Sequence, residues 1–307
     1  MASKKRQLTL HIPKGFLRTE QAQVVLPHFV QRGNPFDYYQ TVNVVAYGAF
    51  CTLYVGESRI SGISKAIKVL DVGSGESEIK KALYEAKIGI QMKHPNLLPI
   101  DEVWYDGIRM FFVMELITPI SVETIFKEAP QVKIVLFQQL VSAVSHLLSK
   151  GILHRDIKLQ NTGLRRGKDG NLDLVLFDYG ETTRFFPDYP ECVGTFLHMA
   201  PEVLKAQQYS GSSEVWALMS FLIEIHTKKP MILHLFEGDI TSVPQLPIEC
   251  KIRELKEPQI PAVFREDTSL SGQLMLHILQ RGLAIDPTER LTLSELEVLL
   301  QELITRF

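Results

Sequence analysis

Between His154 and Asn161 the sequence reads HRDIKLQN, which places a carboxylate, an ammonium group and an amide within a short span; the tripeptide Asp178-Tyr179-Gly180 follows. Apolar runs flank both stretches. Charged groups between buried segments must be paired, solvated in a cleft or bound to an ion. Carboxylate and amide oxygens suit a hard cation such as Mg²⁺, which usually shares its ligands with phosphate. The pattern therefore indicates phosphoryl transfer.

These two stretches resemble the catalytic loop and the metal-binding tripeptide of the protein kinases. The loop matches fully at its Asp, Lys and Asn positions, while Tyr179 replaces the usual Phe. The resemblance covers about residues 37 to 303 and implies an α+β, bilobal kinase fold. We expect a small antiparallel sheet with one helix over 37–116 and a larger, mainly helical lobe over 117–307. Residues 1–36 carry no assignable motif and are expected to be an extension, packed on the main fold or flexible beside it.

The resemblance implies a role for each polar residue of these stretches. Asp156 would accept or orient the proton of the attacking hydroxyl, and Lys158 would neutralise the transferred phosphoryl group. Asn161 and Asp178 would bind magnesium, and His154 would be a packed structural residue. The alternative is that Asp156 and Asp178 are ordinary loop residues in local turns, where Asp is common.

A buried strand with one lysine is predicted over 66–70, where the sequence reads AIKVL. A lone lysine there would extend to solvent, but the resemblance implies that Lys68 contacts the α and β phosphates of ATP while a carboxylate holds it. Recurring apolar residues predict a helix over 77–92. Glu85 stands on this helix at the family's spacing for that partner. Glu78, the competing candidate, is in the first turn, where the helix dipole favours an acidic residue.

A strand, a turn and a strand are predicted over 42–55. Kinases have a glycine-rich loop here, whose backbone N–H groups cover the nucleotide phosphates. Only the central glycine, Gly48, is present; Ala46 and Cys51 occupy the outer positions, and Leu53 stands where Val is common. Taken alone, the pattern is that of an ordinary hairpin. The resemblance implies a loop that covers phosphate less closely.

A second hairpin is predicted over 103–116, because Asp-Gly is a strong two-residue turn signal. It would lead into the hinge between the lobes. By resemblance, Ala66 and Met114 belong to the nucleotide pocket, while Glu115 and Ile117 present backbone groups to the edge of the adenine base.

The catalytic loop needs a rigid mount, and an amphipathic helix over 132–147 is expected to supply it. Glu214 stands where the family has an Asp that hydrogen-bonds the loop backbone, and whether its longer side chain still reaches is open. The sequence DPTER at 286–290 resembles the late kinase motif whose Arg pairs with the Glu of Ala-Pro-Glu, so the resemblance implies that Arg290 pairs with Glu202. A final amphipathic helix over 293–303 is expected to close the domain.

In kinases the arginine at the position of Arg155, directly before the catalytic Asp, usually pairs with an anion from the activation segment, often a phosphothreonine. The usual phosphorylated position falls on Glu191. We therefore hypothesise that Glu191 pairs with Arg155 and permits activity without phosphorylation there, more weakly than phosphate would. The alternative is a solvated surface Glu. Other candidate phosphosites are Thr182, Thr183 and Tyr189.

Thr195 and Lys158 together resemble the serine/threonine branch. The implied reaction transfers the γ-phosphoryl group of ATP, with Mg²⁺, to Ser or Thr hydroxyls of a protein substrate. Gln160 replaces an acidic residue with which some kinases read upstream arginines, so a preference for basic substrates loses one support.

Two rival functions remain open at this point. One is a pseudokinase that binds nucleotide or a partner without turnover, motivated by Ala46, Cys51 and Glu214. The other is a small-molecule kinase of similar fold, against which the Ala-Pro-Glu sequence at 200–202 argues.

Composition limits the remaining classes. With 307 residues, 45% of them hydrophobic, the chain can bury a sizeable core in one large domain or two lobes. A net charge of -2 with interspersed signs gives no pull toward nucleic acid or anionic membrane, and we expect neither as a partner. A regulatory protein partner is compatible with the family.

Cysteine usage and the N-terminus favour a cytoplasmic protein. The three cysteines are widely separated and lack metal-ligand spacing, which favours a reduced compartment. The N-terminus lacks the apolar core of a signal peptide, and no uninterrupted apolar run approaches the roughly 18 residues of a spanning helix. A nuclear location is the alternative, through Lys4-Lys5-Arg6, although so short a basic cluster is more typical of a solvated terminus.

Overall fold

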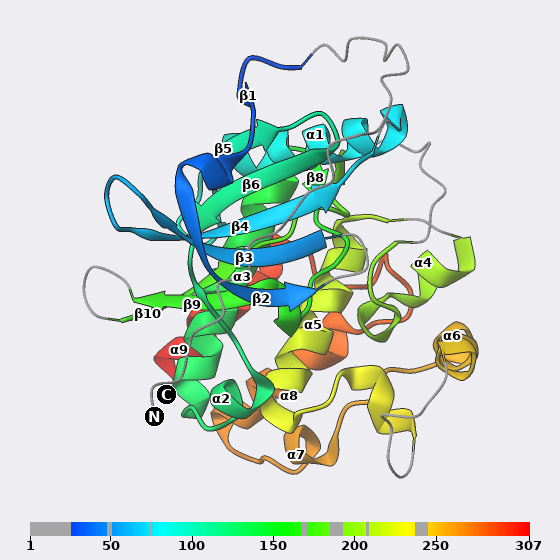
Figure 1. Ribbon diagram of the computed structural model, residues 1–307. Coiled ribbons are helices and arrows are strands. Elements are labelled where there is room, and N and C mark those ends of the chain that lie inside the picture. Colours follow the sequence, from blue (N-terminus) through cyan, green and yellow to red (C-terminus); the bar gives the residue numbers. More distant parts are fainter. Residues whose placement is uncertain are drawn as a thin grey trace, which may run out of the picture.

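The computed structural model describes residues 26–47, 51–73, 75–166, 171–184, 193–206, 209–236 and 245–307. They form two lobes, a smaller one built on a β-sheet and a larger one built mainly of helices (Figure 1). The α+β, bilobal arrangement predicted from the sequence is confirmed. The division of the chain at residues 36 and 116 stays a prediction.

One six-stranded sheet organises the smaller lobe, in the order β1-β5-β6-β4-β3-β2. Neighbouring strands are antiparallel, except that β1 is parallel to β5. At the predicted turn between β5 and β6, Gly107 has a φ of 105° and Asp106 Oδ1 accepts the N–H of Arg109 at 2.8 Å. The strands are β1 (Val30–Arg32), β2 (Tyr39–Tyr47), β3 (Cys51–Ser58), β4 (Ser64–Asp71), β5 (Ile100–Tyr105) and β6 (Arg109–Glu115).

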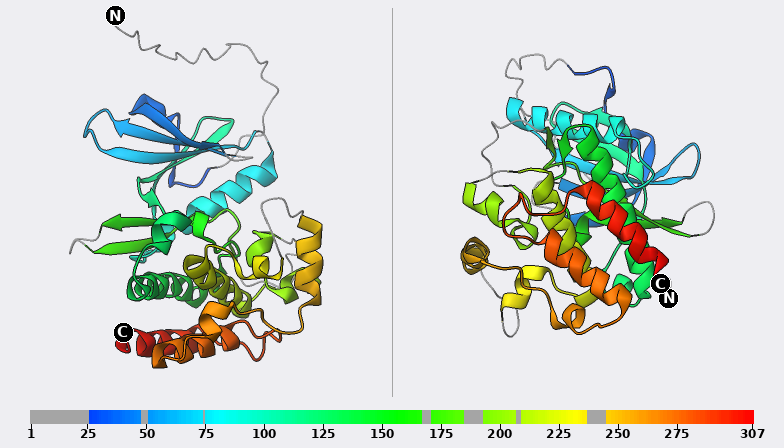
Figure 2. Two further views of the ribbon diagram at one scale, coloured as in Figure 1. Left: turned by 90° about the horizontal axis from the view of Figure 1, so that it is seen from below. Right: turned by 180° about the vertical axis from the view of Figure 1, so that it is seen from behind.

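The two faces of this sheet carry different clusters. Successive side chains of a strand point to opposite faces, so β4 sends Ile67 to one face and Lys68 to the other. Ile67 packs in a cluster that includes the aromatic rings of Trp104 and Phe111. Helix α1 (Glu76–Gln91) packs on the other face, through residues such as the buried Ala86. The left view of Figure 2 shows α1 between the sheet and the helices of the larger lobe.

Part of the N-terminal stretch that carries no motif packs on the sheet. The N–H of Gly33, just after β1, donates to the carbonyl of Tyr105 at 2.9 Å. The short 3₁₀ helix η1 (Pro35–Asp37) follows, and the ring of Phe36 meets that of Tyr54 edge to face at a centroid distance of 5.3 Å. The described part of residues 1–36 is therefore packed against the smaller lobe.

Helices α3 and α5 form the centre of the larger lobe, and both contribute many residues to its main buried cluster. Two small sheets, β10-β9-β7 and β11-β8, lie beside them. The helices are α2 (Val122–Phe126), α3 (Pro130–Ser149), α4 (Pro201–Ala206), α5 (Gly211–Thr227), α6 (Gln245–Glu254), α7 (Ala262–Arg265), α8 (Leu270–Gly282) and α9 (Leu293–Thr305), with short 3₁₀ helices η2 (Leu159–Asn161), η3 (Phe196–His198) and η4 (Met231–Leu235). The strands are β7 (Thr118–Pro119), β8 (Ile152–Leu153), β9 (Thr162–Arg166), β10 (Leu172–Leu176) and β11 (Thr183–Arg184).

Helix α3 is long and apolar enough to cross a membrane by length and composition alone. Half of its most apolar window is buried inside the protein, and the helix packs against α5, α9 and β10. Most of its apolar residues are buried in this packing, so we interpret α3 as the core helix that the sequence predicted as a mount for the catalytic loop.

Arg290 and Glu202 pair as predicted. The guanidinium donates to both carboxylate oxygens, from Nη1 at 2.7 Å and from Nη2 at 3.1 Å. The Arg290 side chain is fully buried and also donates to the carbonyls of Ser212 and Ala284. This pair ties α4 to the segment before α9.

Candidate active site

The sheet residues whose side chains are predicted to line the nucleotide pocket share one face. Directly paired residues of antiparallel strands lie on the same face, and the register pairs Ala46 with Leu53 and Leu53 with Lys68. In the same way Ala66 pairs with Met114. This set and Cys51, which pairs with Leu70, lie on the face that also carries α1. Gly48 lies outside the described residues, so its predicted role is untested.

Lys68 lies between two carboxylates. Its Nζ is 2.6 Å from Oε1 of Glu85 on α1 and 2.8 Å from Oδ1 of Asp178. Burial alone would lower the pKa of Lys68, but the two carboxylates outweigh it and raise that pKa above its usual value. Lys68 is therefore a permanent cation. The structure pairs it with Glu85 and not with the competing candidate Glu78.

Asp178 has a backbone conformation that few residues other than Gly adopt, with a φ of 67°. Burial would raise its pKa, but the ammonium group of Lys68 lowers it overall. Its side chain is 42% exposed, so the carboxylate remains open to a ligand. The next residue, Tyr179, is buried and its hydroxyl donates to the carbonyl of Leu98 at 2.9 Å. The unusual Tyr thus anchors this tripeptide to the segment that follows α1.

The catalytic loop brings four polar side chains together. Oδ2 of Asp156 accepts from Nζ of Lys158 at 2.7 Å and from Nδ2 of Asn161 at 2.9 Å. Thr195, from the distant activation segment, donates to Oδ1 of Asp156 and accepts from Lys158, both at 2.8 Å. Burial raises the pKa of Asp156, but these partners, Lys158 above all, lower it overall. Asp156 is therefore an ionised group and a weak base.

The donors suit a magnesium ion. The amide nitrogen of Asn161 faces two acceptors, the carbonyl and the carboxylate of Asp156, so its amide oxygen points the other way. The N–H of Phe177 donates to the carbonyl of Asn161 at 3.0 Å, which places Asp178 directly after a residue bound to the loop. An amide oxygen and a carboxylate are ligands that Mg²⁺ takes together with phosphate.

The longer side chain of Glu214 does reach the catalytic loop. Its carboxylate accepts the backbone N–H of His154 at 3.2 Å and that of Arg155 at 2.9 Å. These bonds hold Arg155 at a φ of 67°, a conformation that costs roughly 1–3 kcal/mol. Burial raises the pKa of Glu214 to about 7, although the two N–H groups oppose that shift.

The predicted hinge lies at the end of β6. Glu115 is the last residue of β6, and its carboxylate is 3.1 Å from Nη1 of Arg165 on β9. Arg165 also donates to the carbonyl of Pro95, so this arginine of the larger lobe contacts two segments of the smaller one. Ile117, two residues after Glu115, packs closely on Gly163 of β9, where an added Cβ would lie 2.5 Å from its Cδ1.

The activation segment is described only in part. Thr182 is buried, and its hydroxyl donates to the carbonyl of Tyr179 at 2.6 Å, which makes it a poor phosphosite. Thr183 lies in β11, paired with Leu153. Glu191 and Tyr189 lie outside the described residues, and the proposed pairing of Glu191 with Arg155 stays a prediction.

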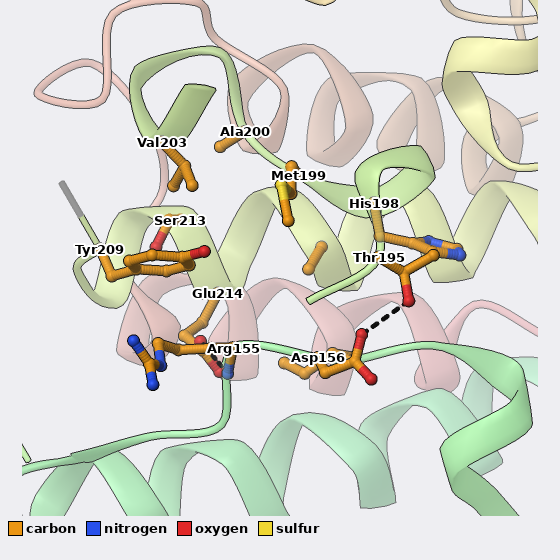
Figure 3. Close-up of a pocket in the computed structure, with 12 residues that line it drawn as sticks. Arg155, Asp156, Thr195, His198, Met199, Ala200, Val203, Tyr209, Ser213 and Glu214 are labelled. Carbon is orange, nitrogen blue, oxygen red and sulfur yellow. Dashed lines mark hydrogen bonds between the residues drawn. The ribbon is translucent and has the colours of Figure 1, made fainter. Parts of the chain in front are cut away.

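A pocket opens beside Asp156, between the catalytic loop, residues 195–203 and α5, and Lys68 does not line it. Figure 3 shows Asp156 and Thr195 at one end of it and Arg155 with Tyr209 at the other. Sequence reasoning missed Tyr209, because a Tyr in a loop carries no local signal for such a contact. It also missed Lys81 on α1, whose Nζ is 3.2 Å from Oε1 of Glu181.

Comparison with known families matches residues 39–301 to the protein kinase domain. A CBL-interacting protein kinase 25 from Oryza sativa subsp. japonica is 30% identical over 276 residues, which is 84% of this chain and 50% of that relative. The CBL-interacting serine/threonine-protein kinase 14 of Arabidopsis thaliana is 34% identical over 212 residues, 63% of this chain and 46% of the relative. A probable myosin light chain kinase of Dictyostelium discoideum is 35% identical over 187 residues, 57% of each chain.

The chain therefore belongs to the protein kinase family, in its serine/threonine branch, as the sequence predicted. It spans about half the length of the curated relatives it matches.

Proposed function

We propose that this chain is a serine/threonine protein kinase that transfers the γ-phosphoryl group of ATP to hydroxyls of a protein substrate. The main support for the proposal is that residues of both lobes come together around Asp178. Lys68 of the sheet contacts Asp178 at 2.8 Å, and the bond from Phe177 to Asn161 joins Asp178 to the catalytic loop. Two observations support transfer to Ser or Thr hydroxyls: Thr195 lies beside Asp156, and relatives are named as serine/threonine kinases.

The nucleotide would lie against the sheet face that bears Lys68, with the hinge at its adenine end. The lysine would hold phosphate oxygens, while the adenine would meet backbone groups of Glu115 and Ile117. The rest of the proposed pocket consists of Ala46, Gly48, Cys51, Leu53, Ala66 and Met114.

MgATP, when bound, supplies the transferable phosphoryl group and the positive charge of the metal. Asn161 and Asp178 would hold the metal through oxygen. Asp156 would orient the attacking hydroxyl; its lowered pKa makes it a weak base, so its main contribution is positioning, with the proton accepted late. Lys158 would balance the negative charge of the transferred group.

We further propose that activity does not require phosphorylation of the activation segment. Glu191 is one candidate for the anion that makes this possible, and Glu191→Ala should then lower the activity of the unphosphorylated protein. The described contacts of Arg155 with Glu181 and Tyr209 support the same proposal by another route.

A regulatory protein partner and a cytoplasmic location, or a nuclear one, stay expectations. The names of the relatives record an interaction with CBL for those proteins, which supports a search for a partner by pull-down.

Transfer of radiolabel from γ-labelled ATP to a generic basic protein tests the proposed function. Wild type should label the protein on Ser or Thr, as phosphoamino acid analysis would show, and Asp156→Asn should not. A wild-type protein that binds MgATP and transfers nothing would favour the pseudokinase, for which the missing outer glycines at Ala46 and Cys51 argue.

A further inference from the structure

Tyr209, between α4 and α5, contacts the part of the activation segment that lies on the catalytic loop. Its hydroxyl accepts the N–H of Val193 at 2.8 Å and donates to the carbonyl of the same residue. A neutral phenol therefore satisfies both backbone groups of Val193. The face of the ring also lies against the guanidinium of Arg155, whose central carbon is 5.1 Å from the ring centroid (Figure 3), within the range of a cation–π contact.

The residues that follow Val193 lie directly on the catalytic loop. Gly194 has a φ of 102°, and a Cβ there would come within 2.3 Å of the carbonyl oxygen of Arg155. The backbone can approach the loop this closely because glycine has no side chain. Thr195 then hydrogen-bonds Asp156 at 2.8 Å. Val193–Thr195 is thus held at both ends, by Tyr209 and by Asp156.

Arg155 connects this segment to the rest of the site. Its backbone N–H is held by Glu214, and its Nε donates to the carbonyl of Glu181 at 2.6 Å. Its guanidinium rests on Tyr209. Arg155 therefore contacts α5, the segment after Asp178, and Tyr209, which hydrogen-bonds Val193.

We propose that Tyr209 is a positioning residue that latches Val193–Thr195 onto the catalytic loop without a phosphate group. A phosphorylated segment gains its hold only when phosphate is added to pair with arginine, whereas a phenol is permanently present. The inference rests on the proposed kinase function. Because Val193–Thr195 lies beside Asp156 and not on the sheet face that bears Lys68, the latch acts on the protein substrate and leaves ATP binding unchanged.

Two variants of Tyr209 separate its contacts. Tyr209→Phe keeps the ring under Arg155 and removes both hydrogen bonds to Val193, while Tyr209→Leu removes the ring contact as well. Tyr105→Phe is the matched control, because its hydroxyl also donates to a backbone carbonyl, that of Gly107 at 2.9 Å, in a hairpin of the smaller lobe. All proteins are prepared free of phosphate, as verified by intact mass.

Two readouts are used. Steady-state kinetics give kcat and KM for a Ser/Thr peptide and KM for ATP. Hydrogen–deuterium exchange at Val193–Thr195 measures the latch itself and does not depend on catalysis. We expect Tyr209→Phe to lower kcat/KM for the peptide about tenfold and to speed exchange at these amides, with KM for ATP unchanged. Tyr209→Leu should lower kcat/KM for the peptide further, and Tyr105→Phe should match wild type in both readouts.

Wild-type exchange and wild-type kinetics in Tyr209→Phe would overturn the latch. An equal loss of ATP and peptide binding in this variant would also overturn it, because that pattern indicates general destabilisation. If wild type transfers no phosphate, the proposed function fails, and the exchange comparison alone still decides whether Tyr209 holds the segment.

Discussion

The carboxylate of Glu214 on α5 accepts the backbone N–H of Arg155 at 2.9 Å. A second N–H, from His154, reaches the other oxygen at 3.2 Å. The helix at the centre of the larger lobe therefore fixes the backbone of the residue directly before Asp156. Sequence alone left the reach of this side chain open, because reach depends on the distance between α5 and the loop.

Replacing Glu214 by Gln should destabilise the fold. The amide has one acceptor oxygen, and its NH₂ group would face an N–H donor in a fully buried place. A buried N–H left without an acceptor costs about 1–3 kcal/mol. We expect that loss in the free energy of unfolding by urea near pH 5, below the raised pKa of Glu214, because above that pKa the cost of a buried carboxylate in wild type would offset it. Equal stability of the variant and wild type would show that these bonds do not hold the loop.

Removing the charge of Glu202 should be more severe. The side chain of Arg290 is fully buried, and Glu202→Gln would leave its charge without an anionic partner, at a cost of about 3–5 kcal/mol. Urea unfolding measures this loss. Glu76→Gln is the matched control, because Glu76 pairs with Lys80 on the exposed surface of α1 and should show no change. Similar small effects in both variants would contradict the assignment of Arg290 as a buried structural cation.

Glu224 should make stability depend on pH. Its Oε2 is buried and lies 3.8 Å from Nε2 of His198; burial raises the pKa of Glu224 to about 7 and lowers that of His198 to about 4. Between the usual carboxyl value and pH 7 the folded state holds a proton that the unfolded state has lost. The contribution of Glu224 to stability therefore falls as pH rises through this window, by up to roughly 3 kcal/mol, while the lowered pKa of His198 contributes in the opposite direction.

Glu224→Gln cannot titrate, so it tests this directly. The variant should gain on wild type between pH 5 and pH 8, by up to roughly 3 kcal/mol in the free energy of unfolding. Glu214 is present in both proteins, so its own titration cancels in the comparison. A difference between the two proteins that stays constant across this range would mean that Glu224 is ionised throughout.

Much of the site could be predicted because its residues stand in short local patterns. The strand around Lys68, the helix that carries Glu85 and the helix before the catalytic loop each follow from periodicity over a few turns or residues. The resemblance then supplied the order in which these elements meet. The resemblance also supplied the pairing of Arg290 with Glu202.

The remaining contacts depend on distances that no local pattern encodes. β1 has three residues and pairs with a strand far along the chain, so its packing had no periodic signal. Two further contacts join segments that are distant in the sequence and meet only in the folded chain. Tyr209 contacts Val193, and Lys81 on α1 contacts Glu181. Lys is mostly exposed and Tyr is often partly exposed, so neither residue type indicates by itself that it has such a partner.

In the proposed reaction, separate groups around one site bind the nucleotide and position the reacting hydroxyl. The most direct test measures MgATP affinity and phosphoryl transfer in the same samples of wild type and Asp156→Asn. We predict that the variant binds MgATP within about twofold of wild type and transfers phosphate at least about a hundredfold more slowly. Equal transfer by both proteins, or loss of MgATP binding in Asp156→Asn, would contradict this account.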